Sequence, residues 1–200
     1  MTEIKNTIRS ANSSKEAIKF FKFAKKGQKL PSDHLRNENY YRKQFALAPD
    51  LLLASFIDDQ LIGVILAGLE INQILIGEFY VDSKYRKRGI GSQLLQQIEI
   101  NALKHGVHYI YLGADPKSEG FYLKNNYKPE LFIQFQGKDS KNWMDDLTEK
   151  YQDLFVIWRQ NNPDSSKMII KTDGLDKKLQ LNINKSYPKA NTVYLFNKKL

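Results

Sequence analysis

A glycine-rich turn between an expected strand and an expected helix constrains this chain more than any other segment. The apolar run 74–81 precedes the turn, and apolar residues at helical spacing follow it over 93–104. Between them, the segment 86–92, of sequence RKRGIGS, places three cations at the start of the helix. The helix macrodipole already makes that end positive, so the cations are unfavourable there unless an anion binds. Free backbone N–H groups and glycines that allow close approach then predict a phosphate site.

Two common phosphate-binding motifs do not fit the sequence. A P-loop needs Lys and then Ser or Thr after the second of two glycines. Gly63 and Gly68 have the required spacing, but Leu69 follows them. A dinucleotide fingerprint needs a third glycine three residues after Gly91, and Leu94 stands there instead. The pattern that remains is Arg-x-x-Gly-x-Gly at the entry to a helix.

Composition excludes several kinds of chemistry. The chain has no cysteine, which rules out disulfides, zinc–thiolate sites and a thiol nucleophile. Its 31 basic and 22 acidic residues give a net charge of +9, but the basic residues are dispersed rather than grouped in a block. We find neither an apolar run long enough to span a membrane nor the apolar segment of a secretory signal. A cytoplasmic protein with no membrane partner is therefore expected.

The periodicity of apolar residues predicts a mixed α/β domain with mostly antiparallel strands. Helices are expected at about 14–27, from Ser32 or Asp33 to about 47, at about 91–104 and at 118–125. Strands are expected at 3–8, 51–57, 61–69, 74–81, 107–112 and 131–136.

The last third has a different character, which we interpret as a β-rich extension. A helix is expected at 143–151, with strands at 154–158, 168–171, 179–183 and 192–196. This divides the chain into a domain at 1–138 and an extension at 139–200. In an alternative interpretation, residues 192–198 return as the final strand of the main sheet and 140–190 is an insertion.

The turn and its surroundings resemble the GCN5-related N-acetyltransferase (GNAT) family. That family carries the acetyl-CoA motif Gln/Arg-x-x-Gly-x-Gly/Ala, which Arg86, Gly89 and Gly91 match. Its usual lead-in is an apolar strand that ends in Val about five residues upstream, and Val81 fits that position. The resemblance implies a central mixed, mostly antiparallel sheet flanked by helices.

A second similarity to the family lies downstream and covers the short helix. Phe121-Tyr122 is followed by Asn126-Tyr127 at the spacing where the family has Gly-Phe. Asn replaces the glycine, and Asn is the next best residue for a left-handed backbone. The family often has Asn seven residues before the Tyr, where this chain has Asp115. Together the two motifs extend the resemblance over about 50–136.

The resemblance implies an N-acetyltransferase that uses acetyl-CoA as cosubstrate and needs no metal. The Val81 N–H would polarise the thioester carbonyl, and Tyr122 would protonate the departing thiolate. We expect Glu78 to take the proton of the amine, with Glu70 on the preceding strand as the second candidate. Glu78 is expected on the opposite strand face from its neighbours Phe79 and Val81. The residues implied to bind the cosubstrate are Phe79, Tyr80, Val81, Arg86, Lys87, Arg88, Gly89, Ile90, Gly91, Ser92 and Asp115.

Several alternatives stay open from sequence alone. Tyr122 is also compatible with a packed core aromatic, and Glu78 with a structural strand carboxylate. The acceptor is a small-molecule amine or a protein amine, and a homodimer is compatible with the sequence. A non-catalytic acyl-CoA sensor or assembly subunit is the main rival function. A basic nucleic-acid-binding module is a weaker rival, because no motif of that class is present.

Overall fold

The structure is a computed structural model that describes residues 5–28 and 36–200. It divides into two compact units, which we describe separately. The first unit comprises Met1–Leu112 with Lys199–Leu200, and the second comprises Gly113–Lys198. The division into 1–138 and 139–200 stays a prediction.

The first unit is built on a sheet in the order β1-β2-β3-β4-β5. Its strands are antiparallel except for β4 and β5, which pair in parallel. The strands are β1 (Thr7–Ser10), β2 (Leu52–Ile57), β3 (Gln60–Glu70), β4 (Gln73–Val81) and β5 (Tyr109–Gly113). The helices are α1 (Ser14–Gln28), α2 (Glu38–Leu47) and α3 (Ile90–Lys104), with short 3-10 turns at Pro49–Leu51 and Ser83–Tyr85.

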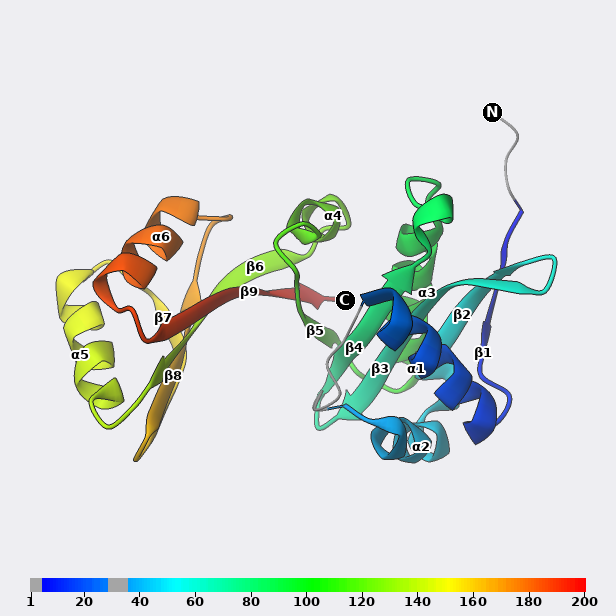
Figure 1. Cartoon of the computed structure of the whole chain (residues 1–200), viewed down its shortest axis with the longest axis horizontal. Coiled ribbons are helices and arrows are strands. Elements are labelled where there is room, and N and C mark those ends of the chain that lie inside the picture. Colours follow the sequence, from blue (N-terminus) through cyan, green and yellow to red (C-terminus); the bar gives the residue numbers. More distant parts are fainter. Residues whose placement is uncertain (1–4, 29–35) are drawn as a thin grey trace. The chain divides into compact units, whose positions relative to one another are not determined.

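Helices cover both faces of this sheet. Helix α1 lies across β3 and β4 (Figure 1), and α2 packs beside it. The buried cluster on this side includes Phe20, Phe21, Tyr41, Val64 and Leu66. On the other side, α3 buries Leu94, Leu95 and Ile98. This double coverage explains why the central strands are apolar on both faces.

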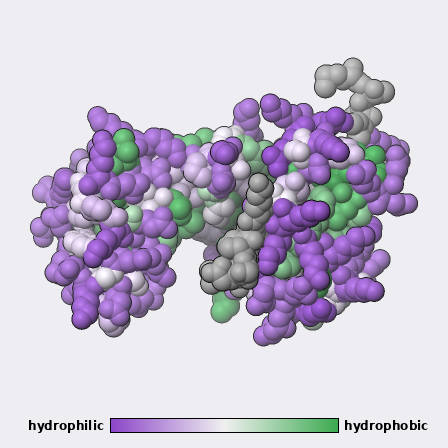
Figure 2. All heavy atoms as spheres, viewed as in Figure 1, coloured by the Kyte–Doolittle hydropathy of each residue, from purple (hydrophilic) through white to green (hydrophobic). Residues whose placement is uncertain are grey.

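The second unit has an antiparallel sheet in the order β9-β6-β8-β7. Its strands are β6 (Lys128–Gln136), β7 (Val156–Asn162), β8 (Ser165–Lys171) and β9 (Ala190–Lys199), and its helices are α4 (Glu119–Lys124), α5 (Ser140–Lys150) and α6 (Lys177–Ser186). Alternate residues of β6, among them Ile133 and Phe135, are fully buried. The visible surface over α5 and α6 is mostly hydrophilic (Figure 2).

One expected strand is a helix instead. Leu179, Leu181 and Ile183 alternate as in a strand, which led to the prediction of a strand at 179–183. The segment belongs to α6, whose N-cap Asp176 accepts a hydrogen bond from the backbone N–H of Leu179 at 2.8 Å. Ile183 is buried whereas Leu181 is 53% exposed, so the alternation did not reflect a strand face.

The starts and ends of the first elements also differ from expectation. The strand expected at 3–8 is β1 (Thr7–Ser10), and residues 3 and 4 lie outside the described residues. Helix α2 is capped by Asn37, which accepts from the Tyr40 N–H at 3.1 Å, and the expected caps Ser32 and Asp33 lie outside the described residues. Gly27, expected as a helix stop, lies within α1.

Across the two described ranges, the helices are too short or too polar for any of them to cross a bilayer.

Candidate functional site

Strand β4 changes its geometry at Gly77. Its pairing with β5 runs from Ile74 to Ile76. Against β3, Ile76 pairs with Ala67 and Glu78 with Leu66, so Gly77 is an extra residue that forms a β-bulge. Bulges bend a strand and turn the following side chains. The strand segment after Gly77 therefore differs in direction and pairing from the segment before it.

Only glycine fits at this bulge without a rearrangement. A Cβ added to Gly77 would lie 2.6 Å from the Tyr41 hydroxyl and 2.7 Å from Cδ of Arg36. Both distances are shorter than normal contacts between non-bonded atoms, so a side chain at Gly77 would force Tyr41 or Arg36 to move. The Tyr41 ring cannot move easily, because it packs on Phe21 and Tyr40 at centroid distances of 5.0 and 5.1 Å.

After the bulge, successive side chains of β4 face opposite sides of the sheet. Glu78 and Tyr80 pair with Leu66 and Val64, which belong to the core beneath α1 and α2. Val81 pairs with Gly63, on the opposite face. A Cβ added to Gly63 would lie 3.3 Å from Val81 and 3.4 Å from Leu94 of α3.

Phe79 shares that face with Val81, because alternate residues of a strand point the same way. It pairs with Ile65 of β3. Glu78 thus faces away from Phe79, as the sequence predicted.

Tyr80 is fixed by close packing on α1. Its ring lies 5.4 Å from the ring of Phe23. A Cβ at Gly27 would overlap the Tyr80 ring, so the glycine allows the helix to approach this ring. The packing explains why Gly27 lies inside a helix, where glycine is otherwise unfavourable.

Glu78 is the most deeply buried carboxylate of the predicted site. It is 1% exposed, and the Tyr41 hydroxyl donates a hydrogen bond to Glu78 Oε1 at 3.3 Å. Burial and the nearby carboxylate raise the pKa of Tyr41, since both disfavour a phenolate. Tyr41 therefore stays a protonated donor throughout the neutral pH range.

The turn after β4 is held by its own side chains. Asp82 accepts from the Lys84 N–H at 2.9 Å, and Arg86 Nε donates to the Val81 carbonyl at 2.8 Å. The Arg86 guanidinium lies 5.4 Å from the centre of the Tyr80 ring. These contacts connect the start of the turn to the end of β4.

The turn ends in a helix start that has free backbone donors. Gly89 is the N-cap of α3 with φ +81°. Because glycine has no side chain, no side-chain capping hydrogen bond is made at this position. The first intrahelical bond runs from the Gln93 N–H to the Gly89 carbonyl at 3.0 Å, so the N–H groups at 90–92 have no acceptor within the helix. Nothing lies within 4 Å of a Cβ built on Gly89. The arrangement provides donors and open space for an anion.

Cations surround this helix start. Arg86, Lys87 and Arg88 are all exposed, and Lys87 has a left-handed backbone with φ +62°. The structure thus brings together the predicted residues of segment 86–92 directly after β4. Ile90 differs from the others, because its side chain is buried and only its backbone can contact a ligand.

In the second unit, Asp115 organises the entry to α4. Its carboxylate accepts from the Lys117 N–H at 2.8 Å, and its carbonyl accepts from the Ser118 N–H at 2.7 Å. Asp115 itself is exposed. The residue therefore has an evident structural role in the turn at 115–118.

Tyr122 of α4 lies in an aromatic cluster. It is 7% exposed, and its ring lies 5.4 Å from Phe196 and 6.1 Å from Tyr127. Burial raises the pKa of Tyr122, so its hydroxyl stays protonated at neutral pH. After α4, Asn126 has φ +64°, which confirms the left-handed turn that was predicted there.

Sequence reasoning missed Tyr41 and Gly77. Tyr41 contacts Glu78 across 37 positions of the chain, and no local pattern indicates such a contact. Gly77 did carry a signal, because an isolated glycine within a strand often marks a bulge.

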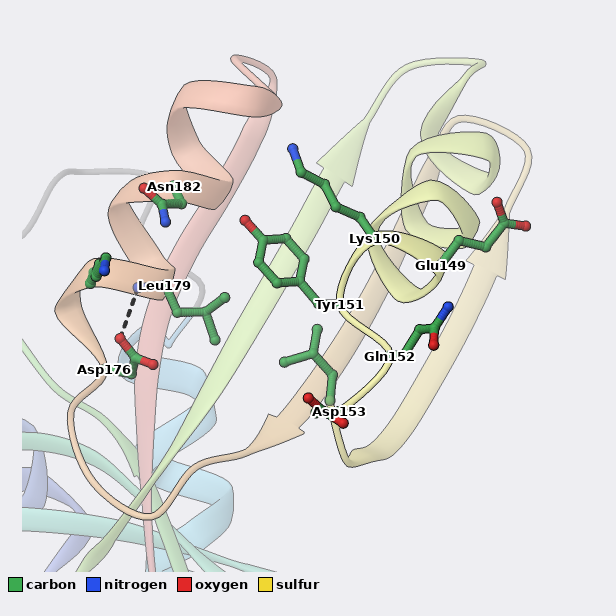
Figure 3. A pocket seen from close by; sticks show the side chains of 10 residues that line it. Glu149, Lys150, Tyr151, Gln152, Asp153, Asp176, Leu179 and Asn182 are labelled. Atoms are coloured by element: carbon green, nitrogen blue, oxygen red, sulfur yellow. Dashed lines mark hydrogen bonds between the residues drawn. The ribbon is translucent and has the colours of Figure 1, made fainter.

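Two open grooves in the structure do not involve the predicted residues. One, of about 520 Å³, lies in the second unit between α6 and the segment that links α5 to β7 (Figure 3). Tyr151 and Leu179 point into it from the two sides. The other, of about 810 Å³, lies in the first unit beside Ile8 of β1 and Gln93 of α3. No predicted site residue lines either groove.

Comparison with known families and structures gives a consistent result. A family model described as the acetyltransferase (GNAT) family matches residues 13–127, which is more than half of the 200-residue chain. None of the curated proteins matches the sequence significantly.

Three solved structures share the fold at low sequence identity. A diaminobutyrate acetyltransferase from Paenibacillus lautus, in complex with L-2,4-diaminobutyric acid and coenzyme A, has a TM-score of 0.52 at 13% identity, and the match covers 84% of this chain and 95% of that one. A putative acetyltransferase from Pyrococcus horikoshii has a TM-score of 0.50 at 16% identity, covering 98% and 89%. A GNAT-family acetyltransferase from Staphylococcus aureus has a TM-score of 0.50 at 18% identity, covering 82% and 98%. These matches confirm the expected mixed, mostly antiparallel sheet flanked by helices.

Proposed function

The chain belongs to the GNAT acetyltransferase family, and we propose that it transfers an acetyl group from acetyl-CoA to a primary amine by direct attack within a ternary complex. The observation that carries the proposal is the start of α3, where Gly89 leaves the N–H groups at 90–92 without acceptors in the helix. A diphosphate of acetyl-CoA would accept from these groups and would be balanced by the cations at 86–88. The exposed segment and the open space at Gly89 support this assignment.

Strand β4 would hold the pantetheine arm. Its pairing with β5 ends at Ile76, so the backbone from Phe79 to Val81 can offer donors and acceptors at that edge. Arg86 already occupies the Val81 carbonyl, which leaves the Val81 N–H as the group to polarise the thioester. Asp115, in the turn before α4, would also contact acetyl-CoA, as its position in the family motif implies.

The proposed reaction balances with two proton transfers. The amine nitrogen forms a bond to the thioester carbon, the carbon–sulfur bond breaks, and the electron pair leaves on sulfur. Glu78 accepts the proton that the amine loses, directly or through a water molecule. Tyr122 gives a proton to the thiolate. Burial raises the pKa of its phenol, which keeps Tyr122 protonated but makes it a weaker acid, so the proton has to pass while the carbon–sulfur bond breaks rather than after it.

The absence of a cysteine nucleophile favours direct transfer. The sequence has no cysteine, so an acetyl-cysteine intermediate cannot form. Initial rates measured against both substrates should give intersecting reciprocal plots. Parallel plots with an isolable acetyl-enzyme would contradict direct transfer.

The function is tested by thiol release from acetyl-CoA over a panel of small amines, amino acids, aminoglycosides and peptides. Turnover with any primary amine supports the proposal, and the preferred amine identifies the acceptor class. Tight binding of CoA without turnover on the panel would instead favour a non-catalytic acyl-CoA sensor. An absence of heat in calorimetry and of a thermal shift with CoA would contradict the phosphate site itself.

A further inference from the structure

We infer that Lys177 of α6 is a positioning residue, which together with Glu119 fixes the short helix α4 that carries Tyr122. The inference rests on the proposed function, because it assigns a role in turnover through Tyr122. The inference also gives the C-terminal extension a role, since α6 and β9 would hold α4, the helix that carries the proposed acid Tyr122.

The central contact is an ion pair within the second unit. Lys177 Nζ lies 2.7 Å from Glu119 Oε1. The Glu119 side chain is only 6% exposed, whereas that of Lys177 is 48% exposed. The Lys177 ammonium also lies 4.6 Å from the ring centre of the buried Tyr194 of β9. A buried carboxylate needs such a partner, because an unpaired charge is costly away from water.

Helix α4 depends on contacts of this kind. It has six residues, and a helix of that length is not stable by itself. Residues of β9 supply further contacts: Phe196 packs on the Tyr122 ring, and Lys198 Nζ donates to the Asn125 carbonyl at 3.2 Å. The ion pair adds a fixed point at the first residue of α4, one turn before Tyr122.

Helix α6 can act as a support because it is itself tied to β9. Gln180 Nε2 donates to the Thr192 carbonyl at 3.1 Å, and the Thr192 hydroxyl donates to Asn184 Oδ1 at 2.9 Å. Lys177 is the first residue of α6, where a positive charge opposes the helix dipole. The pairing with Glu119 offsets this unfavourable placement.

The difference in burial predicts an unequal effect of the two partners. Lys177→Met leaves the Glu119 carboxylate buried and unpaired. Glu119→Gln leaves a half-exposed ammonium that water can solvate. We therefore expect a larger loss of turnover for Lys177→Met than for Glu119→Gln, and recovery in Lys177→Arg, which keeps the charge and can reach the same carboxylate.

The test is a comparison of steady-state kinetics in two backgrounds. In the wild-type background, Lys177→Met should lower kcat by about 10- to 100-fold, as expected when a reacting group is misplaced by about 1 Å, with the Kd for CoA unchanged. In a Tyr122→Phe background the same substitution should cause no further loss, because it acts through Tyr122. Equal losses in both backgrounds would overturn the inference.

The control and a second measurement keep the test independent of folding and of the acceptor. Lys178→Met changes the next residue of α6, which is exposed and makes no ion pair with the residues that the structure describes; it should leave kcat unchanged. Hydrogen exchange at the N–H groups of Tyr122 and Tyr127 should become faster in Lys177→Met but not in Lys178→Met. If the wild-type protein turns over no amine, the proposed function fails. Unchanged hydrogen exchange in Lys177→Met would separately overturn the inference that the ion pair of Lys177 with Glu119 fixes α4.

Discussion

The Tyr41 hydroxyl lies 3.3 Å from Oε1 of Glu78 and donates a hydrogen bond to it inside the first unit. Both side chains are almost completely buried, Tyr41 at 0% and Glu78 at 1% exposure. The Gly77 bulge allows this approach, because any larger residue would overlap the Tyr41 hydroxyl. The carboxylate proposed to accept the amine proton therefore sits on a rigid support.

Tyr41→Phe should lower both stability and turnover. It removes a donor from a buried carboxylate, which costs about 1–3 kcal/mol in the free energy of unfolding. Because Glu78 loses a fixed partner, kcat should fall while the Kd for CoA stays constant. Urea unfolding and steady-state kinetics measure the two effects. Tyr109→Phe, at a residue that is 40% exposed, serves as the control. Unchanged kcat in Tyr41→Phe would exclude a catalytic role for this hydrogen bond.

The buried tyrosines predict a loss of stability at alkaline pH. Burial raises the pKa values of Tyr41 and Tyr122 above that of a free tyrosine. Above about pH 10 the unfolded chain loses these protons and the folded chain keeps them, so stability falls as pH rises. Each such group contributes a slope of up to about 1.4 kcal/mol per pH unit. Urea unfolding between pH 9 and 11 should give a shallower slope for Tyr41→Phe than for Tyr109→Phe. Equal slopes would contradict the assignment.

Two helix glycines should respond in opposite directions to alanine. In an open helix, Gly→Ala stabilises by about 0.5–1 kcal/mol. Gly120→Ala in α4 should show this gain, because nothing lies within 4 Å of the added Cβ. Gly27→Ala should instead destabilise by about 1–3 kcal/mol, because its Cβ would overlap the Tyr80 ring. Thermal unfolding of the two variants measures both effects, and a stabilised Gly27→Ala would disprove the packing described for α1.

The phosphate site can be tested with a matched pair of glycines that flank the two ends of α3. Gly89→Glu should weaken CoA binding by more than about 100-fold, or about 2.7 kcal/mol, since it puts a carboxylate where the diphosphate is proposed to bind. Gly106→Glu is the control: Gly106 follows the other end of α3, also has a positive φ, and also has open space around its Cβ. Both variants share the backbone strain, so isothermal titration with CoA isolates the charge effect. Similar Kd values for the two variants would contradict the site.

Local patterns were sufficient for much of the first unit. The apolar run 74–81 and the glycine turn at 86–92 predicted β4, the turn and the start of α3, because hydrophobic period and helix-start chemistry are local properties. The prediction of a strand at 179–183 was wrong, because three alternating apolar residues are compatible with a strand or a helix. The N-cap Asp176 and the burial of Ile183 stabilise the helix instead. Tyr41 could not be predicted, since its partner Glu78 is brought near only by the folded sheet.

Tyr122→Phe separates the proposed acid from a packing role. The ring would keep its contacts with Phe196 and Tyr127, so stability should change by less than about 1 kcal/mol, while loss of the proton donor should lower kcat by about 10²–10⁴-fold. The Kd for CoA should stay constant, because the hydroxyl is proposed to act on the departing thiolate. Tyr127→Phe is the matched control, since Tyr127 is 2% exposed and packs against the same ring.

An acetyl donor with a more acidic leaving thiol needs less protonation, so a thioester of lower thiol pKa should restore part of the lost rate in Tyr122→Phe alone. Full activity of Tyr122→Phe with acetyl-CoA would leave Tyr122 as a packing residue and require another proton source.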